Sequence, residues 1–147
     1  PHALALLGLG DGELLESLRA MAVPGVRLPG SASADEVRTH LLTARALAFP
    51  SVLYEGQPMS VLEAMSCGTP VIASHRGGTP ALLDASPGAW LPAAGDVRSW
   101  ARALTDLASS PAVADEVGPA LRRRWARDHT GAAALERLTA IYESVRR

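Results

Sequence analysis

Residues 54 to 73 read YEGQPMSVLEAMSCGTPVIA, which predicts a loop, a helix and a buried strand in that order. The helix is expected to begin near Met59 and to end at Gly68, because glycine commonly terminates helices and the proline at position 70 cannot continue one. The apolar run from Val71 to Ala73 then has the composition of a short buried strand. Such a loop–helix–strand unit is typical of α/β proteins.

Two carboxylates lie in this segment, eight positions apart. Glu55 falls in the loop, and Glu63 falls inside the helix. The first turn of a helix offers unpaired backbone N–H groups and the positive end of the helix dipole, and both attract anions. An anion at this helix start, with a carboxylate on each side, suggests a phosphorylated ligand that also carries hydroxyl groups.

Short apolar segments alternate with helical patterns along the chain, which favours an open parallel α/β sheet with helices on both faces. About five strands are expected, at residues 3–7, 26–28, 46–49, 71–73 and 89–91. Further helices are expected at residues 13–21, 33–44, 79–83, 97–107 and 112–128, and from residue 130 onward as a helical C-terminal tail. The helix at Ser33 opens with the S-x-x-E pattern of a capping box. Because no linker or repeat interrupts this alternation, residues 1–147 are expected to form one domain.

Open α/β sheets bind ligands beyond the carboxyl ends of their strands. The loops expected at this edge are residues 8–12, 29–33, 50–58 and 74–79. The third of these loops contains Glu55, so the carboxylate pattern and the expected topology point to the same edge. The glycines of residues 8–12 are not spaced as G-x-G-x-x-G, and a tight turn is expected there instead of a dinucleotide site.

The composition excludes several classes of function. The chain has 147 residues and a net charge of −1, which gives no reason to expect nucleic acid as a partner. It contains no lysine, so Schiff-base chemistry and a P-loop are excluded, and its single cysteine cannot form an internal disulfide. No Cys/His cluster has metal-ligand spacing. A cytoplasmic location is expected, because the sequence shows neither a signal-peptide pattern nor an apolar stretch of ~20 residues.

The central segment resembles the donor-binding domain of retaining glycosyltransferases of the GT-B architecture, family 4. The resemblance is carried by the motifs FPS, YEG, EAM and GTPVIAS within residues 49–74, and by GGTP at residues 77–80. Weaker similarity covers nearly all of the remaining chain. The resemblance implies a Rossmann-like domain that forms the C-terminal half of a GT-B enzyme and binds a nucleotide sugar.

This resemblance also implies roles for particular residues. Glu55 would accept hydrogen bonds from sugar hydroxyls and support positive charge at the anomeric carbon, and Glu63 would hold the ribose hydroxyls. The backbone from Gly56 to Val61 would bind the diphosphate at the helix start, with no metal ion or other cofactor. The full donor-binding set is Glu55, Gly56, Gln57, Pro58, Met59, Ser60, Val61 and Glu63, with Gly10, Leu28 and Arg76 as weaker candidates. The side chain of Gln57 is expected to touch either the donor or water.

The sequence departs from the family pattern in several respects. Family members usually begin this domain with one more strand and helix, which carry an arginine and a lysine that bind the diphosphate. Here the chain opens at Pro1, without that unit and without the acceptor-binding domain that normally precedes it. Ala81 stands where relatives often have a glutamate. We therefore expect that the isolated chain does not complete catalysis, although its parent enzyme would.

The resemblance implies a UDP- or GDP-sugar as the donor and leaves the sugar, the base and the acceptor open. The absent N-terminal domain would choose the acceptor and would provide any contact with a membrane. Two other functions fit the same architecture: a non-catalytic module that binds a nucleotide sugar or a protein, and a nucleotide-sugar epimerase. The paired glutamates favour the transferase over the epimerase. The missing diphosphate-binding residues would favour the non-catalytic module if this chain were a complete gene product.

Overall fold

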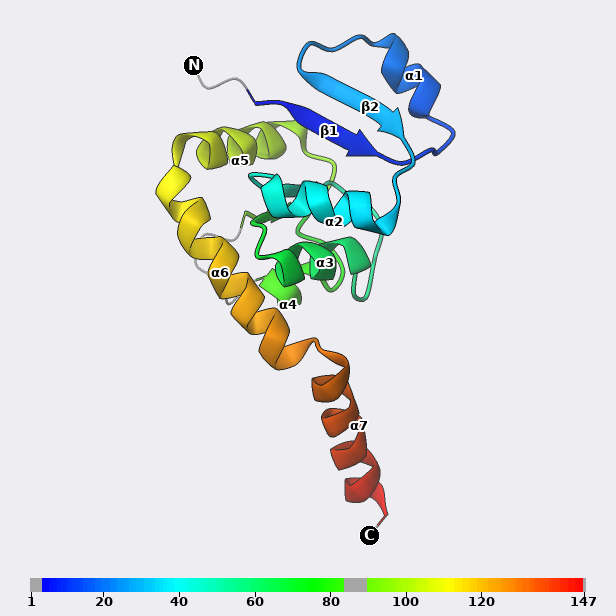
Figure 1. The fold of residues 1–147 in the computed structure, drawn as a ribbon, viewed down its shortest axis with the longest axis vertical. Coiled ribbons are helices and arrows are strands. Elements are labelled where there is room, and N and C mark those ends of the chain that lie inside the picture. Colours follow the sequence, from blue (N-terminus) through cyan, green and yellow to red (C-terminus); the bar gives the residue numbers. More distant parts are fainter. Residues whose placement is uncertain (1–3, 84–89, 147) are drawn as a thin grey trace.

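The computed structural model describes residues 4–83 and 90–146 of the chain (Figure 1). Its elements are, in order, β1 (Leu6–Leu9), α1 (Leu15–Ala20), β2 (Val26–Gly30), α2 (Ala34–Thr43), β3 (Leu47–Phe49), α3 (Met59–Cys67), β4 (Val71–Ala73), α4 (Thr79–Leu83), α5 (Val97–Ser109), α6 (Pro111–Asp128) and α7 (Gly131–Val145). Parallel strand pairs are interleaved with helices, which confirms the predicted α/β class.

Helix α3 has the bounds that its sequence predicts. It runs from Met59 to Cys67, and Gly68 follows in a left-handed conformation with a φ of 73°. The next residue, Thr69, donates its N–H to the carbonyl of Ala64 at 2.9 Å, so the last turn of the helix is closed by the chain that leaves it. The chain then enters β4 after a single further residue.

The capping box predicted for α2 is also present. Glu36 N donates to Ser33 Oγ at 3.3 Å, and Ser33 N donates to Glu36 Oε2 at 2.8 Å. Hydrogen bonds from the Ser33 backbone and side chain lower the pKa of the Glu36 carboxyl. Local sequence thus determines where this helix begins.

The strands form two small sheets, so the prediction of one sheet of about five strands is wrong. β1 pairs with β2, and β3 pairs with β4. The expected fifth strand is reduced to one isolated bridge between Ile72 and Trp90, and residue 89 lies outside the described residues. Two residues further on, Pro92 has no N–H group with which to continue a ladder. Apolar periodicity locates strands, but it does not say which strands pair.

The first strand lies further along the chain than its sequence predicts. It spans Leu6–Leu9 instead of residues 3–7, so its last two residues are strand and not turn. Pairing with β2 runs from Leu6 opposite Val26 to Leu9 opposite Gly30, and this partner keeps the segment extended. Residue 3 lies outside the described residues.

Strand β4 is covered by helices on both of its faces. Val71 and Ala73 are buried in the cluster that contains the core residues of α3 and α6, whereas Ile72 points the opposite way. On that side, Ile72 packs with Ala103 and Leu107 of α5. The three residues of this strand are therefore all buried, and its two-faced covering agrees with the predicted layering.

Helix α6 packs closely against the end of α3. Gly118 of α6 lies against the backbone of Gly68, and a Cβ atom at Gly118 would overlap the Gly68 carbonyl oxygen. Val117 and Leu121 flank this contact, and each is 1% exposed. The absence of a side chain at position 118 thus sets how near the two helices can lie.

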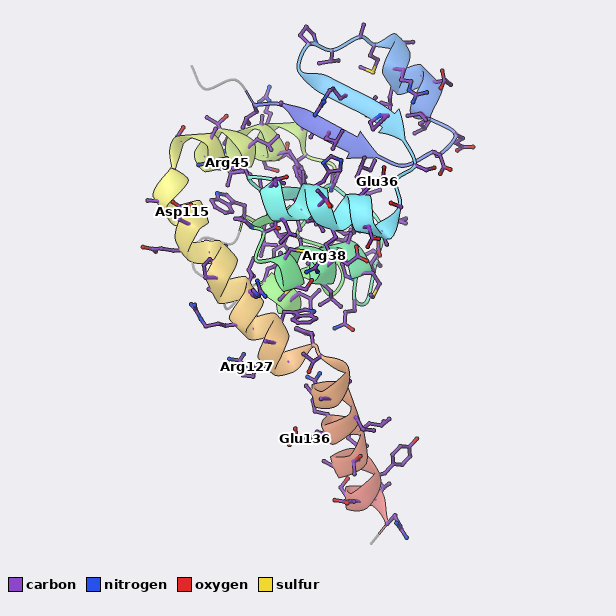
Figure 2. All side chains as sticks on the ribbon, in the orientation of Figure 1. Glu36, Arg38, Arg45, Asp115, Arg127 and Glu136 are labelled. Carbon is purple, nitrogen blue, oxygen red and sulfur yellow. The ribbon has the colours of Figure 1, made fainter. Side chains whose placement is uncertain are left out.

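Helix α7 forms the C-terminal tail that the sequence predicts, and it extends away from the rest of the chain (Figure 1). It contains no buried residue, and its Leu135, Ile141 and Tyr142 are 65%, 60% and 61% exposed. Figure 2 shows the charged side chains of Arg127 and Glu136 projecting from α6 and α7. Within the described residues, none of the helices combines the length and the apolar character needed to cross a bilayer.

Replacing Gly118 with alanine tests the close packing of α6 on α3. Glycine to alanine in a helix usually stabilises by about 1 kcal/mol. Here we expect Gly118→Ala to lower the free energy of unfolding by about 1–3 kcal/mol, because the new methyl group meets backbone that cannot move aside. Urea unfolding measures the change. Gly131→Ala is the control, because a Cβ there meets nothing within 4 Å; equal effects of the two variants would contradict the packing described.

Candidate functional site

The loop that carries Glu55 is held against the turn after β4. Gly78 donates its N–H to the Glu55 carbonyl at 2.7 Å. A Cβ atom at Gly77 would meet the backbone of Glu55, and one at Gly78 would overlap the carbonyl of Gly56. The two glycines thus let two loops at the carboxyl ends of β3 and β4 approach backbone to backbone. This is the edge at which the sequence predicts a ligand.

The Glu55 carboxylate is held by its own loop. Ser51 Oγ donates to Glu55 Oε1 at 3.2 Å, and it accepts a hydrogen bond from Leu53 N at 3.2 Å. The side chain of Glu55 is half-buried, so its orientation is restricted before any ligand arrives. Sequence reasoning assigned no such role to Ser51, although the serine lies in the FPS motif.

Arg76, one of the weaker candidates, lies beside this loop. Its guanidinium carbon stands 4.1 Å from the centre of the Tyr54 ring, a cation–π contact. The arginine comes from the turn after β4, so the structure brings it next to the residue that precedes Glu55. Of the other weaker candidates, Leu28 belongs to β2, and Gly10 directly follows β1 and donates its N–H to Gly30 O at 2.8 Å.

The start of helix α3 offers the backbone groups that the sequence predicts. Pro58 is the N-cap, and among the described residues no side chain caps this end. The first helical bond joins Leu62 N to Pro58 O at 3.3 Å, so the N–H groups of residues 59 to 61 precede the ladder. Pro58 and Val61 are buried, and Met59 is 65% exposed. The first turn is therefore anchored in the core on one side and open to solvent on the other.

Exposure divides the remaining predicted residues. Gly56, Gln57 and Glu63 are exposed, and Ser60 is half-buried. Glu63 stands in the second turn of α3, on the side of the helix that does not face the core. The candidate site is thus a surface at the carboxyl edge of β3 and β4, made by one loop, one helix start and one turn.

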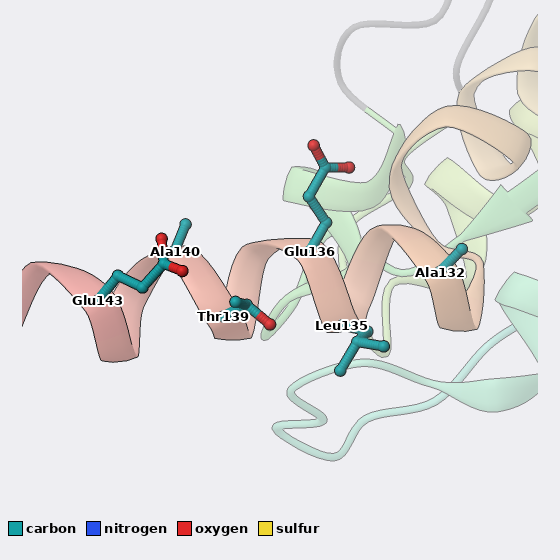
Figure 3. Close-up of a pocket in the computed structure, with 6 residues that line it drawn as sticks. All are labelled: Ala132, Leu135, Glu136, Thr139, Ala140 and Glu143. Carbon is teal, nitrogen blue, oxygen red and sulfur yellow. The ribbon is translucent and has the colours of Figure 1, made fainter.

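Neither of two hollows on the molecule coincides with this surface. One, of about 470 Å³, lies along α7 and is lined by Ala132, Leu135, Glu136, Thr139, Ala140 and Glu143 (Figure 3). The other, of about 430 Å³, is lined by residues just before β3 and β4 and by Asp115 and Pro119 of α6. That second hollow lies at the amino ends of the two strands, opposite the Glu55 loop.

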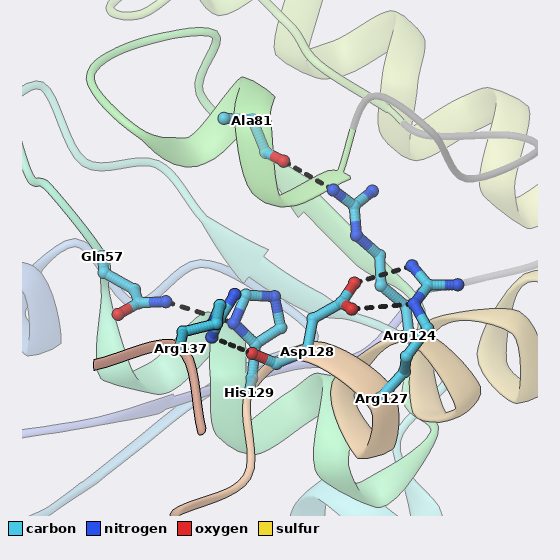
Figure 4. A network of polar contacts seen from close by, with 7 residues as sticks. All are labelled: Gln57, Ala81, Arg124, Arg127, Asp128, His129 and Arg137. Carbon is cyan, nitrogen blue, oxygen red and sulfur yellow. Dashed lines mark hydrogen bonds and ion pairs between the residues drawn. The ribbon is translucent and has the colours of Figure 1, made fainter. Parts of the chain in front are cut away.

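A contact that sequence reasoning missed joins the loop to the C-terminal helices. Gln57 Nε2 lies 3.2 Å from His129 Nδ1, across 72 positions of sequence (Figure 4). His129 follows the last residue of α6. Partial burial lowers the pKa of the His129 imidazole. The nearby carboxylate of Asp128 acts in the opposite direction and raises it, but the net effect is a lower pKa. The Gln57 amide thus meets a histidine, a contact that no local sequence pattern signals. The expected contact of Gln57 with the donor or with water stays a prediction.

Comparison with known proteins identifies the family. Residues 2–110 match the family described as Glycosyl transferases group 1. The chain is 28% identical over 145 residues to the amylovoran biosynthesis glycosyltransferase AmsK of Erwinia amylovora, covering 92% of this chain and 36% of AmsK. It is 33% identical over 137 residues to the GDP-mannose-dependent alpha-(1-6)-phosphatidylinositol monomannoside mannosyltransferase of Mycolicibacterium smegmatis, covering 85% of this chain and 35% of that protein. The chain belongs to the group 1 glycosyltransferases.

A solved structure shares the fold. Anabaena HepE, in complex with UDP-glucose, matches with a TM-score of 0.84 at 17% identity, over 99% of this chain and 42% of that one. Likeness at this level of identity supports the architecture alone. The chain spans about a third of the length of the curated relatives that it matches, from 27% to 36% of the first four of them.

Gly78→Ala tests whether the glycine pair holds the Glu55 loop. We expect faster hydrogen exchange at the amide of residue 78, which donates to the Glu55 carbonyl, because a methyl group at position 78 displaces the Gly56 carbonyl and separates the two loops. Hydrogen–deuterium exchange with mass spectrometry measures this. Gly12→Ala is the matched control, since a Cβ at that glycine meets nothing within 4 Å. Unchanged exchange in the Gly78 variant would show that the loop does not depend on this contact.

Proposed function

We propose that this chain is the donor-binding domain of a retaining glycosyltransferase, which moves a sugar from a nucleoside-diphosphate sugar to an acceptor. The observation that carries the proposal is the placement of the Glu55 loop beside the open start of α3. Membership of the group 1 glycosyltransferases supports it. In the parent enzyme this unit would be the C-terminal half of a GT-B architecture.

The diphosphate would bind at the first turn of α3. The N–H groups of residues 59 to 61 point out of the helix start, where the positive end of the dipole attracts anions. Arg76 stands close enough to the loop to add positive charge near the same edge. We propose that these groups neutralise the leaving diphosphate without a metal ion.

The two carboxylates would hold the two sugars of the donor. Glu63, exposed on α3, would accept hydrogen bonds from the ribose hydroxyls. Glu55 would accept them from the transferred sugar and would lie near the anomeric carbon, where positive charge develops as the bond to the diphosphate breaks. A carboxylate that is already oriented by Ser51 stabilises such a charge with little reorganisation.

The identity of the base is open between uridine and guanosine. The relative from Mycolicibacterium smegmatis is named as dependent on GDP-mannose, and HepE was solved with UDP-glucose. Calorimetric titration of this chain with UDP, GDP, UDP-glucose and GDP-mannose tests the proposal directly. We expect the chain to bind at least one of these nucleotides. If it binds none of them, the proposed function is wrong.

Alanine substitutions separate the two carboxylate roles. Glu63→Ala should weaken binding of the nucleoside diphosphate and of its sugar by about tenfold, the loss of hydrogen bonds to a charged group. Glu55→Ala should weaken only the binding of the nucleotide sugar, because UDP and GDP lack the sugar whose hydroxyls Glu55 would hold. The same titrations measure both effects. Glu116→Ala, an exposed glutamate on α6, is the control. Equal losses for both ligand classes in both variants would contradict the assignment.

We further propose that this chain alone does not complete transfer. The proposal rests on its span of about a third of its curated relatives. A coupled assay for release of UDP or GDP from the corresponding nucleotide sugar should show no turnover above the rate without protein. Clear turnover by the 147-residue chain would refute this.

A further inference from the structure

The junction between α6 and α7 contacts the candidate site directly. His129 is the C-cap of α6, where its backbone N–H donates to Trp125 O at 2.9 Å. Its ring nitrogen Nδ1 lies 3.2 Å from the amide of Gln57 (Figure 4). The next residue, Thr130, caps α7 by accepting a hydrogen bond from Ala133 N at 3.2 Å. The imidazole is therefore carried by a backbone that two helix ends restrain.

The same junction is held by side chains around the histidine. Arg127 Nε and Nη2 donate to the two carboxylate oxygens of Asp128 at 2.7 and 2.6 Å. Arg137 of α7 donates to the Asp128 carbonyl. One turn earlier on α6, Arg124 Nη2 donates to Ala81 O of α4 at 2.7 Å. Helix α4 begins immediately after Gly78, so α6 is linked to both segments that meet at the Glu55 loop (Figure 4).

We propose that His129 is a positioning residue, which fixes Gln57 and through it the loop 54–58 in the arrangement that binds the donor. The proposal rests on the donor-binding role proposed above and adds a residue from the C-terminal helices to it. Gln57 stands two residues before the first helical residue of α3 and two after Glu55. A restraint on its side chain therefore limits the motion of the segment between the two expected contact points for the donor.

The charge state of the histidine fits this hydrogen bond. A neutral imidazole that carries its proton on Nε2 accepts at Nδ1, and the Gln57 amide nitrogen can then donate. Partial burial favours the neutral form. Asp128 opposes this effect, and Arg124, Arg137 and Arg127 reinforce it, with a net lowering of the pKa of His129. The lowered pKa thus favours the neutral imidazole. Protonation of the ring would place an Nδ1–H donor opposite the Gln57 NH₂ donor. The hydrogen bond could then form only after the Gln57 amide flips to present its oxygen.

The first experiment tests the contact without any ligand. The pKa of His129 is measured by NMR titration of the histidine ring protons, in the natural chain and in Gln57→Glu. A carboxylate beside the imidazole favours the charged ring, so Gln57→Glu should raise the pKa of His129. His40, exposed on α2, serves as the internal reference in both samples. No change at His129 would overturn the proposal, because the two side chains would then not be in contact in solution.

The second experiment measures the effect on the donor. Calorimetry with the nucleotide bound by the natural chain compares His129→Ala, Gln57→Ala, the double variant and His129→Asn. Loss of one neutral hydrogen bond predicts affinities lower by about twofold to tenfold in each single alanine variant. The double variant should be no weaker than either single variant, since both remove the same link. His129→Asn should retain most of the affinity, because its side-chain oxygen can accept from Gln57. His40→Ala is the control.

The outcomes separate the two proposals. If the natural chain binds none of the nucleotides, the donor-binding function fails and the positioning role fails with it, even where the pKa experiment shows the contact. If the natural chain binds but His129→Ala leaves affinity unchanged, only the positioning role is overturned. Additive losses in the double variant, or a loss in His129→Asn as large as in His129→Ala, would show a merely structural histidine.

Discussion

The burial of helix α3 is the constraint on which the rest of this structure depends. Val61, Ala64 and Met65 are 0% exposed, and they pack in one cluster with β4 and α6. Full burial of a valine or methionine side chain contributes about 1.5–3 kcal/mol. Because one side of α3 is buried in the core, the rotation of the helix about its own axis and its position along β4 are determined. Its start therefore comes to lie at the carboxyl edge of the strands, with Met59 open to solvent.

Close contacts between backbones also hold both ends of α3 in place. At its C-terminal end, Gly68 meets Gly118 of α6; at its N-terminal end, the Glu55–Gly56 loop meets the Gly77-Gly78 turn. Each contact needs a position without a Cβ atom. A site made this way is preorganised, because the loop and the helix start are held before a ligand binds, and less ordering is left to oppose binding.

The C-terminal helices have two roles in this arrangement. Helix α6 packs on the core through Val117 and Leu121, and its end carries His129 to the Gln57 side chain. Helix α7 contributes no buried residue among those described. The junction between them is therefore where the exposed tail and the candidate site are physically linked.

Much of the local structure follows from sequence alone. Residues 54–73 determine the loop, the helix with its glycine stop and the strand, and Ser33 with Glu36 determines the start of α2, because caps and apolar periodicity act between neighbours in sequence. Only the tertiary structure decided that β3 and β4 pair apart from β1 and β2, and that His129 meets Gln57. The strand pairs join backbone groups of separate segments, and the His129–Gln57 contact depends on where α6 packs on the core. Both join segments far apart in the chain, which no local pattern specifies.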